Sequence, residues 1–116
     1  MKFSGNLDKN FKLMEKFFTE KLDFNVVERP FFIKDYGIEK ELYLTRKDDK
    51  VNVFVTKYNF DDEEVDFTLQ GRPEIAENYW KYILYFLDPE EDKYKNQNAI
   101  DEIENFFKNK GVWFEK

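Results

Sequence analysis

Apolar residues recur at helical spacing near the start of the chain. Leu7, Phe11, Met14 and Phe18 lie three or four positions apart, which predicts an amphipathic helix over residues 6–22. Small polar residues precede this stretch and suit the N-cap position of a helix. The first element of the fold is therefore expected to be a helix with one buried face.

A period of two replaces this spacing in the middle of the chain. Apolar and polar residues alternate over three stretches and predict three antiparallel strands, at 42–44, 51–55 and 65–69. The short polar run 47–50 suits the first reversal. Residues 24–28 and 31–33 are also predicted to be extended, interrupted at Pro30 because proline cannot donate to a ladder. The second face of this sheet carries Tyr43 and Phe54, and it is either solvated or partly covered.

Helical spacing returns in the last third of the chain. Pro73 followed by Glu74 is typical of a helix start, and the apolar pattern predicts a helix over residues 73–87. Its apolar positions fill an arc of about 200° centred on Ile83, so this helix is expected to be buried on more than one side. Tyr85 falls outside that arc, on the polar strip.

A second start signal follows this helix. A cap residue, a proline and two acids at 88–91 predict a short helical turn. A last helix is predicted over 97–110, ending before Gly111 with Val112 placed for the accompanying apolar contact.

The order of elements predicts an α+β fold. An N-terminal helix, an antiparallel meander of three to four strands and two to three C-terminal helices on one face of the sheet account for the whole chain. We expect one domain over residues 1–116 without a linker or targeting segment. The longest apolar run, Tyr82–Leu87, is shorter than the roughly 18 residues of a membrane span, so no membrane contact is expected and a cytoplasmic location is predicted.

Composition removes most catalytic classes. The chain contains no His and no Cys, and Ser4 is its only serine, which excludes Ser/His hydrolysis, thiol nucleophiles and structural zinc sites. The four glycines are too dispersed for a nucleotide-binding loop. We therefore expect a protein that is not an enzyme and has no cofactor.

Charge is distributed unevenly along the chain. Residues 1–58 carry twelve basic and ten acidic side chains, whereas residues 59–116 carry seven basic and fifteen acidic ones. The acids of the second half form three clusters: Asp61, Asp62, Glu63, Glu64 and Asp66; Asp88, Glu90, Glu91 and Asp92; Asp101, Glu102 and Glu104. Such a surface favours encounter with a basic partner, although it also serves simply as a solvated face.

The spacing of the acids within these clusters does not suit a metal site. Four consecutive acids point in different directions in an extended chain, and no glycine supplies the turn of a calcium loop. Asp48-Asp49-Lys50 resembles part of a two-metal nuclease site, but a hairpin tip is a poor place for one. No metal is expected.

Aromatic residues make up 20% of the chain, and most of them fall on predicted inner faces. Tyr85 and Trp113 do not, and these two residue types often anchor interfaces. Direct nucleic-acid binding is disfavoured because a net charge of -6 opposes a polyphosphate.

These observations favour a non-catalytic binding protein of the inhibitor, immunity-protein, antitoxin or phage anti-defence kind, encoded by a bacterium or phage. Its acidic C-terminal half, with Tyr85 and Trp113, is expected to engage a basic protein. One alternative is a structural or regulatory subunit that docks through apolar surface such as Trp113 and Phe114. Another is a metal-dependent hydrolase built from carboxylates alone.

Overall fold

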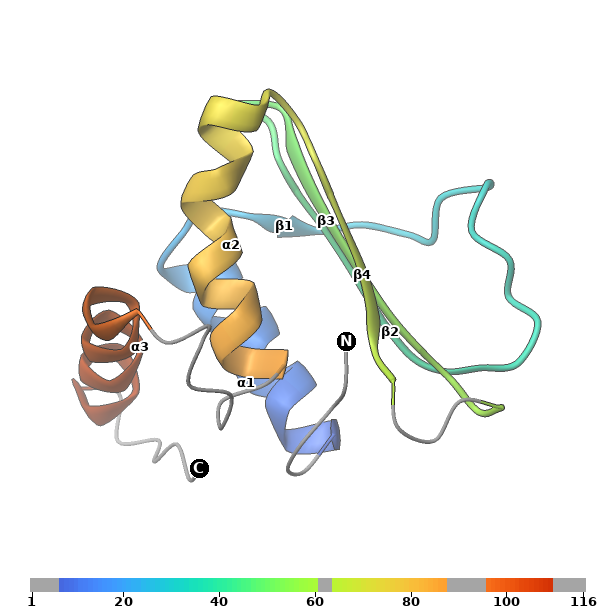
Figure 1. The fold of residues 1–116 in the computed structure, drawn as a ribbon, viewed down its shortest axis with the longest axis horizontal. Helices are drawn as coiled ribbons and strands as arrows, with labels where there is room; N and C mark the ends of the chain where they lie inside the picture. Colours follow the sequence, from blue (N-terminus) through green and yellow to red (C-terminus); the bar gives the residue numbers. More distant parts are fainter. Residues whose placement is uncertain (1–6, 61–63, 88–95, 110–116) are drawn as a thin grey trace.

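The structure, a computed structural model, describes residues 7–60, 64–87 and 96–109. Four antiparallel strands pair in the order β1-β2-β3-β4, and the helices lie on one side of this sheet (Figure 1). The elements are α1 (Leu7–Glu20), β1 (Asn25–Val26), β2 (Ile38–Arg46), β3 (Val51–Tyr58), β4 (Asp66–Gln70), α2 (Pro73–Leu87) and α3 (Gln97–Asn109). The predicted α+β fold is confirmed.

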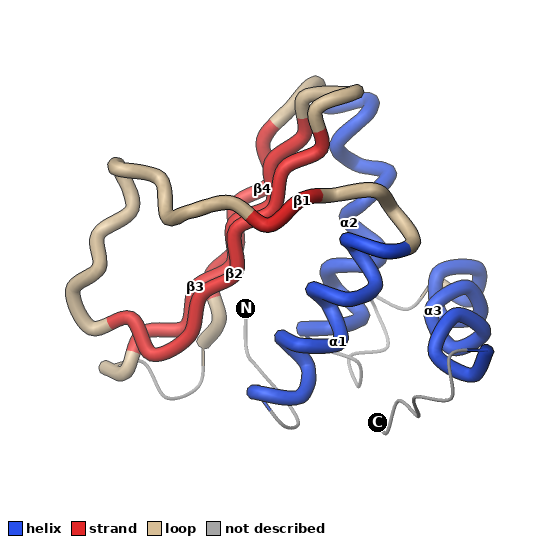
Figure 2. The backbone as a smooth tube through the Cα atoms, turned by 180° about the vertical axis from the view of Figure 1, so that it is seen from behind, coloured by secondary structure: helices blue, strands red, loops and turns tan. Residues whose placement is uncertain are grey.

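The alternation of the strands separates an inner from an outer sheet face. Leu44, Val53 and Val55 are fully buried on the face that the helices cover. The turn at residues 47–50 joins β2 to β3, and the pairing of Arg46 with Val51 closes it, as the polar run predicts. The sheet is therefore a simple meander with one face committed to the core (Figure 2).

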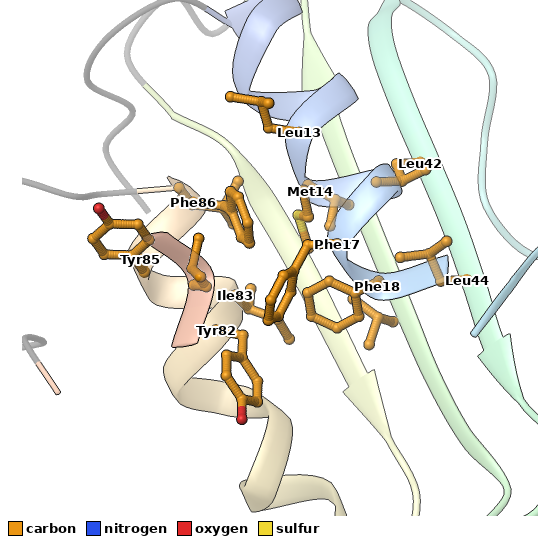
Figure 3. Close-up of a cluster of buried hydrophobic side chains, with 14 of the residues drawn as sticks. Leu13, Met14, Phe17, Phe18, Leu42, Leu44, Tyr82, Ile83, Tyr85 and Phe86 are labelled. Atoms are coloured by element: carbon orange, nitrogen blue, oxygen red, sulfur yellow. The ribbon is translucent and has the colours of Figure 1, made fainter. Parts of the chain in front are cut away.

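Helix α1 supplies the centre of the core. Phe17 and Phe18 are fully buried, and Figure 3 shows them between α2 and the strands. The ring centroid of Phe17 lies 5.3 Å from that of Tyr82, 5.8 Å from that of Phe86 and 5.4 Å from that of Phe106. A single side chain of α1 thus contacts both later helices.

Helix α2 has the wide buried surface that its apolar arc predicts. Ile83, Phe86 and Leu87 are fully buried, and α2 packs against α1 and β4 on one side and α3 on the other. Trp80 lies within the predicted apolar arc, yet it is 47% exposed and packs edge-on against Phe67.

The prediction that Tyr85 is exposed is wrong. Tyr85 is only 5% exposed, and its hydroxyl donates a hydrogen bond to Glu104 of α3 at 3.3 Å. The helical wheel of α2 assigns position 85 to the polar strip because the wheel contains no information about the neighbouring helix. Packing of α3 against this part of α2 makes position 85 part of the helix interface (Figure 1).

The extended stretch around Pro30 is also shorter than predicted. Only Asn25 and Val26 pair with β2, and the amide of Val27 donates one further bond to the Tyr43 carbonyl at 2.9 Å. Residues 31–33 form a turn in which the Ile33 amide donates to the Pro30 carbonyl at 3.0 Å. Pro30 removes a ladder donor at this point, so the chain leaves the sheet edge.

Helix α3 agrees with the predicted helix to within one residue. The side chain of Asn96 caps it by accepting the backbone N–H of Ala99 at 3.1 Å. The predicted turn at 88–91 and the contacts of Gly111, Val112 and Trp113 lie outside the described residues. Across residues 7–60, 64–87 and 96–109, the helices are all too short or too polar to cross a bilayer.

Candidate functional site: an aromatic surface on the outer face of the sheet

The four most exposed aromatic side chains of the described residues come from one loop and the end of β3. Phe31 is fully exposed, Tyr36 is 80% exposed, Phe60 is 68% exposed and Phe32 is 55% exposed. Phe31, Phe32 and Tyr36 belong to the long loop 27–37 between β1 and β2, and Phe60 lies two residues after the end of β3. We call these four side chains the aromatic surface. Exposed apolar patches of this kind mark interaction sites.

Ring contacts join the aromatic surface to the strands beneath it. Phe31 lies edge-on to Phe32, with centroids 5.9 Å apart, and Phe32 lies 6.0 Å from Phe54 on β3. On the other side, Phe60 stacks on Tyr58 at 5.2 Å. Phe31, Phe32 and Phe60 are thus continuous with aromatic residues of the sheet.

The backbone of Gly37 lets the loop approach Phe60 closely. The residue has a φ of 73°, and a β-carbon there would lie 3.2 Å from Cδ1 of Phe60 and 3.0 Å from Oδ1 of Asn59. The Asn59 amide donates to the Gly37 carbonyl at 2.7 Å. Glycine fits both the left-handed conformation and the narrow space.

An arginine clasp ties the loop to β2. Arg29 donates from Nε and one terminal nitrogen to the two carboxylate oxygens of Glu41, at 2.7 and 2.9 Å. Its other terminal nitrogen lies 3.4 Å from Asp35, and the Tyr43 hydroxyl donates to Glu41 at 2.9 Å. The Arg29 hydrogen bond lowers the pKa of Glu41, so the carboxylate stays charged near neutral pH.

The outer face is therefore partly covered, one of the two possibilities that the sequence leaves open. Tyr43 and Phe54 are buried, with their rings 5.7 Å apart. The loop lies on the side of the sheet away from the helices (Figure 1). Further along the same face, Thr45 donates to Asn52 at 2.7 Å, and Asn52 donates to Gln70 at 3.1 Å. The outer face thus has an aromatic end and a polar end.

A hollow of about 340 Å³ opens between the loop and the aromatic end of the sheet. Phe32, Phe54 and Tyr58 line it with rings, and Lys34 and Asp66 contribute the charged groups. Thr56 and Thr68 complete the strand side. Facing pairs Phe54–Thr68 and Thr56–Asp66 on β3 and β4 supply much of this lining.

The structure brings one predicted acidic residue to this hollow. Asp66 is the exposed first residue of β4 and lines it, and Glu64 lies just before the strand. The side chain of Tyr85 in α2 is buried against α3, so it is not available as a contact residue at an exposed surface. The remaining predicted contact residues lie outside the described part of the chain: Asp61, Asp62, Glu63, Glu90, Glu91, Asp92 and Trp113.

The acids of α3 contribute to packing. Glu102 accepts a hydrogen bond from the buried Tyr82 hydroxyl at 2.5 Å, Glu104 accepts one from Tyr85, and Asp101 accepts one from Gln97. Burial and then the bond to Glu102 raise the pKa of Tyr82. Burial and then the charge of Glu104 raise that of Tyr85. The bonds from the two buried tyrosines give Glu102 and Glu104 a structural role.

The hairpin acids have a structural role as well. Asp49 accepts a hydrogen bond from Tyr79 at 2.6 Å and pairs with Arg46 at 3.1 Å. Arg46 also donates to the Leu22 carbonyl at 3.0 Å, which joins the hairpin to the end of α1. Within the described ranges, no three carboxylates converge as metal ligands.

The aromatic surface was not among the sequence-predicted contact residues. Its signal is nevertheless visible: Pro30 and Gly37 bracket a short segment that contains Phe31, Phe32 and Tyr36. Proline and glycine mark a loop, and rings in a loop lack the regular periodicity that places them in a core.

Comparison of this chain with protein-family models, with curated proteins and with solved structures finds no match.

Proposed function

We propose that this protein is a small non-catalytic protein-binding module that engages a basic protein partner. It would be of the inhibitor, immunity-protein, antitoxin or anti-defence kind. The observation that carries the proposal is the aromatic surface, in which Phe31, Tyr36 and Phe60 expose most of their rings to solvent. Exposed rings gain free energy when a partner removes them from water, and aromatic residues are enriched at the centres of interfaces.

The charge of the chain supports a basic partner. Asp66 lies at the hollow beside the aromatic surface, and the sequence immediately before it contains the acidic run 61–64. With a net charge of -6, the protein repels nucleic acid and accelerates encounter with a basic protein surface.

The chemistry of the chain supports binding rather than catalysis. Neither His nor Cys is present to act as a general base or a nucleophile near neutral pH. A cytoplasmic setting belongs to the same proposal, since a chain without Cys suits a reducing compartment.

A capture experiment followed by a binding measurement tests the proposal. Wild-type protein and a Phe31→Ser/Tyr36→Ser/Phe60→Ser variant are each immobilised on a support and incubated with an extract of the source organism. The captured proteins are then quantified. A purified partner should bind wild type with an on-rate that falls as salt rises, and the triple variant should weaken binding at least tenfold. A partner indifferent to both the variant and salt contradicts the proposal.

Trp80 supports a second candidate, a structural or regulatory subunit that docks through apolar surface. Its half-exposed ring borders a second hollow of about 740 Å³, which Leu69, Pro73 and Ala76 also line. A Trp80→Ser variant in the same experiment separates the two candidates. Binding that depends on Trp80, is insensitive to salt and tolerates the triple variant favours the subunit.

A further inference from the structure

We infer that the 340 Å³ hollow beneath the loop is a binding site for a basic side chain of the partner, an arginine or a lysine. This inference rests on the proposed function and names the chemistry that the aromatic surface selects.

Three aromatic rings give the hollow an affinity for a cation. Phe32 from the loop and Phe54 and Tyr58 from β3 line it, and their ring faces carry negative electrostatic potential. Phe32 and Phe54 are tilted by 58° with centroids 6.0 Å apart, so they form two different walls. A guanidinium or ammonium group within about 6 Å of such ring faces is attracted to them.

Asp66 supplies a formal negative charge at the same place. Across the described ranges, its carboxylate makes neither a hydrogen bond nor an ion pair. The Thr56 hydroxyl, opposite it on β3, likewise has no side-chain hydrogen bond within those ranges. A bound cation would therefore meet a carboxylate and a hydroxyl as acceptors without displacing contacts described within the fold.

Lys34 is the opposing charge, since it lines the hollow from the loop side. Its side chain is exposed and has no ion-pair partner in the described ranges, so it can move away into solvent. An anionic occupant would gain from Lys34 alone and would lie beside Asp66 and three aromatic rings. The balance therefore favours a cation, and Lys34 should oppose its binding.

The size of the hollow favours a side chain over a larger ligand. Its volume of about 340 Å³ is at the lower end of ligand pockets, and one wall is a loop open to solvent. The surrounding aromatic surface would then cover apolar residues next to the inserted cation.

A titration of the whole protein with blocked amino acids tests the inference. N-acetyl-arginine amide is added while the backbone amide NMR signals are followed. The neutral N-acetyl-norleucine amide and the acidic N-acetyl-glutamate amide are compared at the same ionic strength. We expect the arginine probe to shift the signals of Thr56, Tyr58 and Thr68 saturably, and at lower concentration than either comparator.

Charge variants sharpen the test. Asp66→Asn keeps the shape of the side chain and should weaken the arginine probe severalfold, whereas Lys34→Gln should strengthen it. Asp23→Asn is the matched control. It removes an exposed carboxylate between α1 and β1, where a φ of 63° suits asparagine, and should leave binding unchanged.

Two outcomes overturn the inference. Equal signal shifts from the arginine and norleucine probes, unaffected by Asp66→Asn, would identify an apolar binding site. Preferential binding of the glutamate probe would identify an anion-binding site. Neither outcome affects the proposed function, which is tested by the partner's dependence on Phe31, Tyr36 and Phe60. Conversely, failure to find a partner leaves the arginine titration fully informative.

Discussion

The side-chain amide of Asn10 in α1 donates a hydrogen bond to the backbone carbonyl of Phe86 at the end of α2, at 3.0 Å and across 76 positions of sequence. Asn10 is buried, and Phe86 belongs to the last four residues of its helix, whose carbonyls lack an intrahelical donor. One polar side chain therefore links the early part of α1 to the C-terminal turn of α2 within the core.

Replacing Asn10 by alanine should destabilise the protein by about 1–3 kcal/mol, because a buried carbonyl loses a donor and the core loses volume. Chemical denaturation measures this change. Asn105→Ala is the matched control, since Asn105 is exposed on α3 and its loss should change stability by less than about 0.5 kcal/mol. Equal stabilities of the two variants would show that the Asn10 bond contributes nothing.

The hydrophobic pattern predicts most of the architecture because each element buries one regular face. The inner-face residues Leu44, Val53 and Val55 alternate as a half-buried sheet requires, and they are fully buried. Asn10 and Tyr85 are the instructive cases. Each is a polar or amphipathic residue buried by an element distant in sequence, and periodicity within one helix carries no information about that partner.

Ile83 tests the predicted depth of α2. The side chain is fully buried in the core cluster, and Ile83→Ala should cost about 2–5 kcal/mol of unfolding free energy. Ile75→Ala, at a partly buried position of the same helix, should cost less. A loss below about 0.5 kcal/mol at Ile83 would place that side chain on the surface and contradict the packing of α2.

Tyr79 predicts an alkaline limit to stability. Burial, and then the hydrogen bond to Asp49, raise the pKa of Tyr79 from its ordinary value near 10 to about 12. The unfolded chain therefore releases the hydroxyl proton at a lower pH than the folded chain does. The contribution of Tyr79 to the free energy of unfolding is complete below about pH 10 and is lost as the pH rises towards about 12. Stability measured across this window should fall more steeply for wild type than for Tyr79→Phe.

The control for that measurement is Tyr36→Phe, which removes one tyrosine at an exposed position of the loop. Lysines also titrate in this pH range and contribute equally to all three proteins, so the difference between the variants isolates Tyr79. Parallel curves for wild type and Tyr79→Phe would refute the assignment.

The candidate site was less predictable than the fold, for a physical reason. Charge is visible in a sequence, and it predicts a contact role for Asp66 and the acids around it. Exposure of a ring is not visible, because Phe31 and Phe17 are the same residue type, and only tertiary packing leaves the first in solvent and the second in the core. The turn residues Pro30 and Gly37 are the local feature that distinguishes the exposed segment.

The contacts of Arg29 with Glu41 and Asp35 should keep the loop 27–37 ordered. The Arg29 guanidinium binds both oxygens of Glu41 and approaches Asp35, a forked geometry that lysine cannot reproduce. In Arg29→Lys, the amides of Ile33 in the loop and Ile38 at the start of β2, which donate to the carbonyls of Pro30 and Asp35, should exchange with solvent severalfold faster. The thermal midpoint should change little, because the clasp lies at the surface and outside the hydrophobic core.

Arg72→Lys provides the matched control for hydrogen exchange. Arg72 is exposed before α2, and the structure records no salt bridge for it within the described ranges, so its replacement should leave Ile33 and Ile38 unchanged. The amides of Val53 and Val55 at the centre of the sheet should remain equally protected in all three proteins, which separates loop loosening from global unfolding. If Ile33 and Ile38 exchange at the same rate with arginine or lysine at position 29, the clasp does not hold the loop. The contact of Phe32 with Phe54 and the bond from the Asn59 amide to the Gly37 carbonyl must then hold the loop.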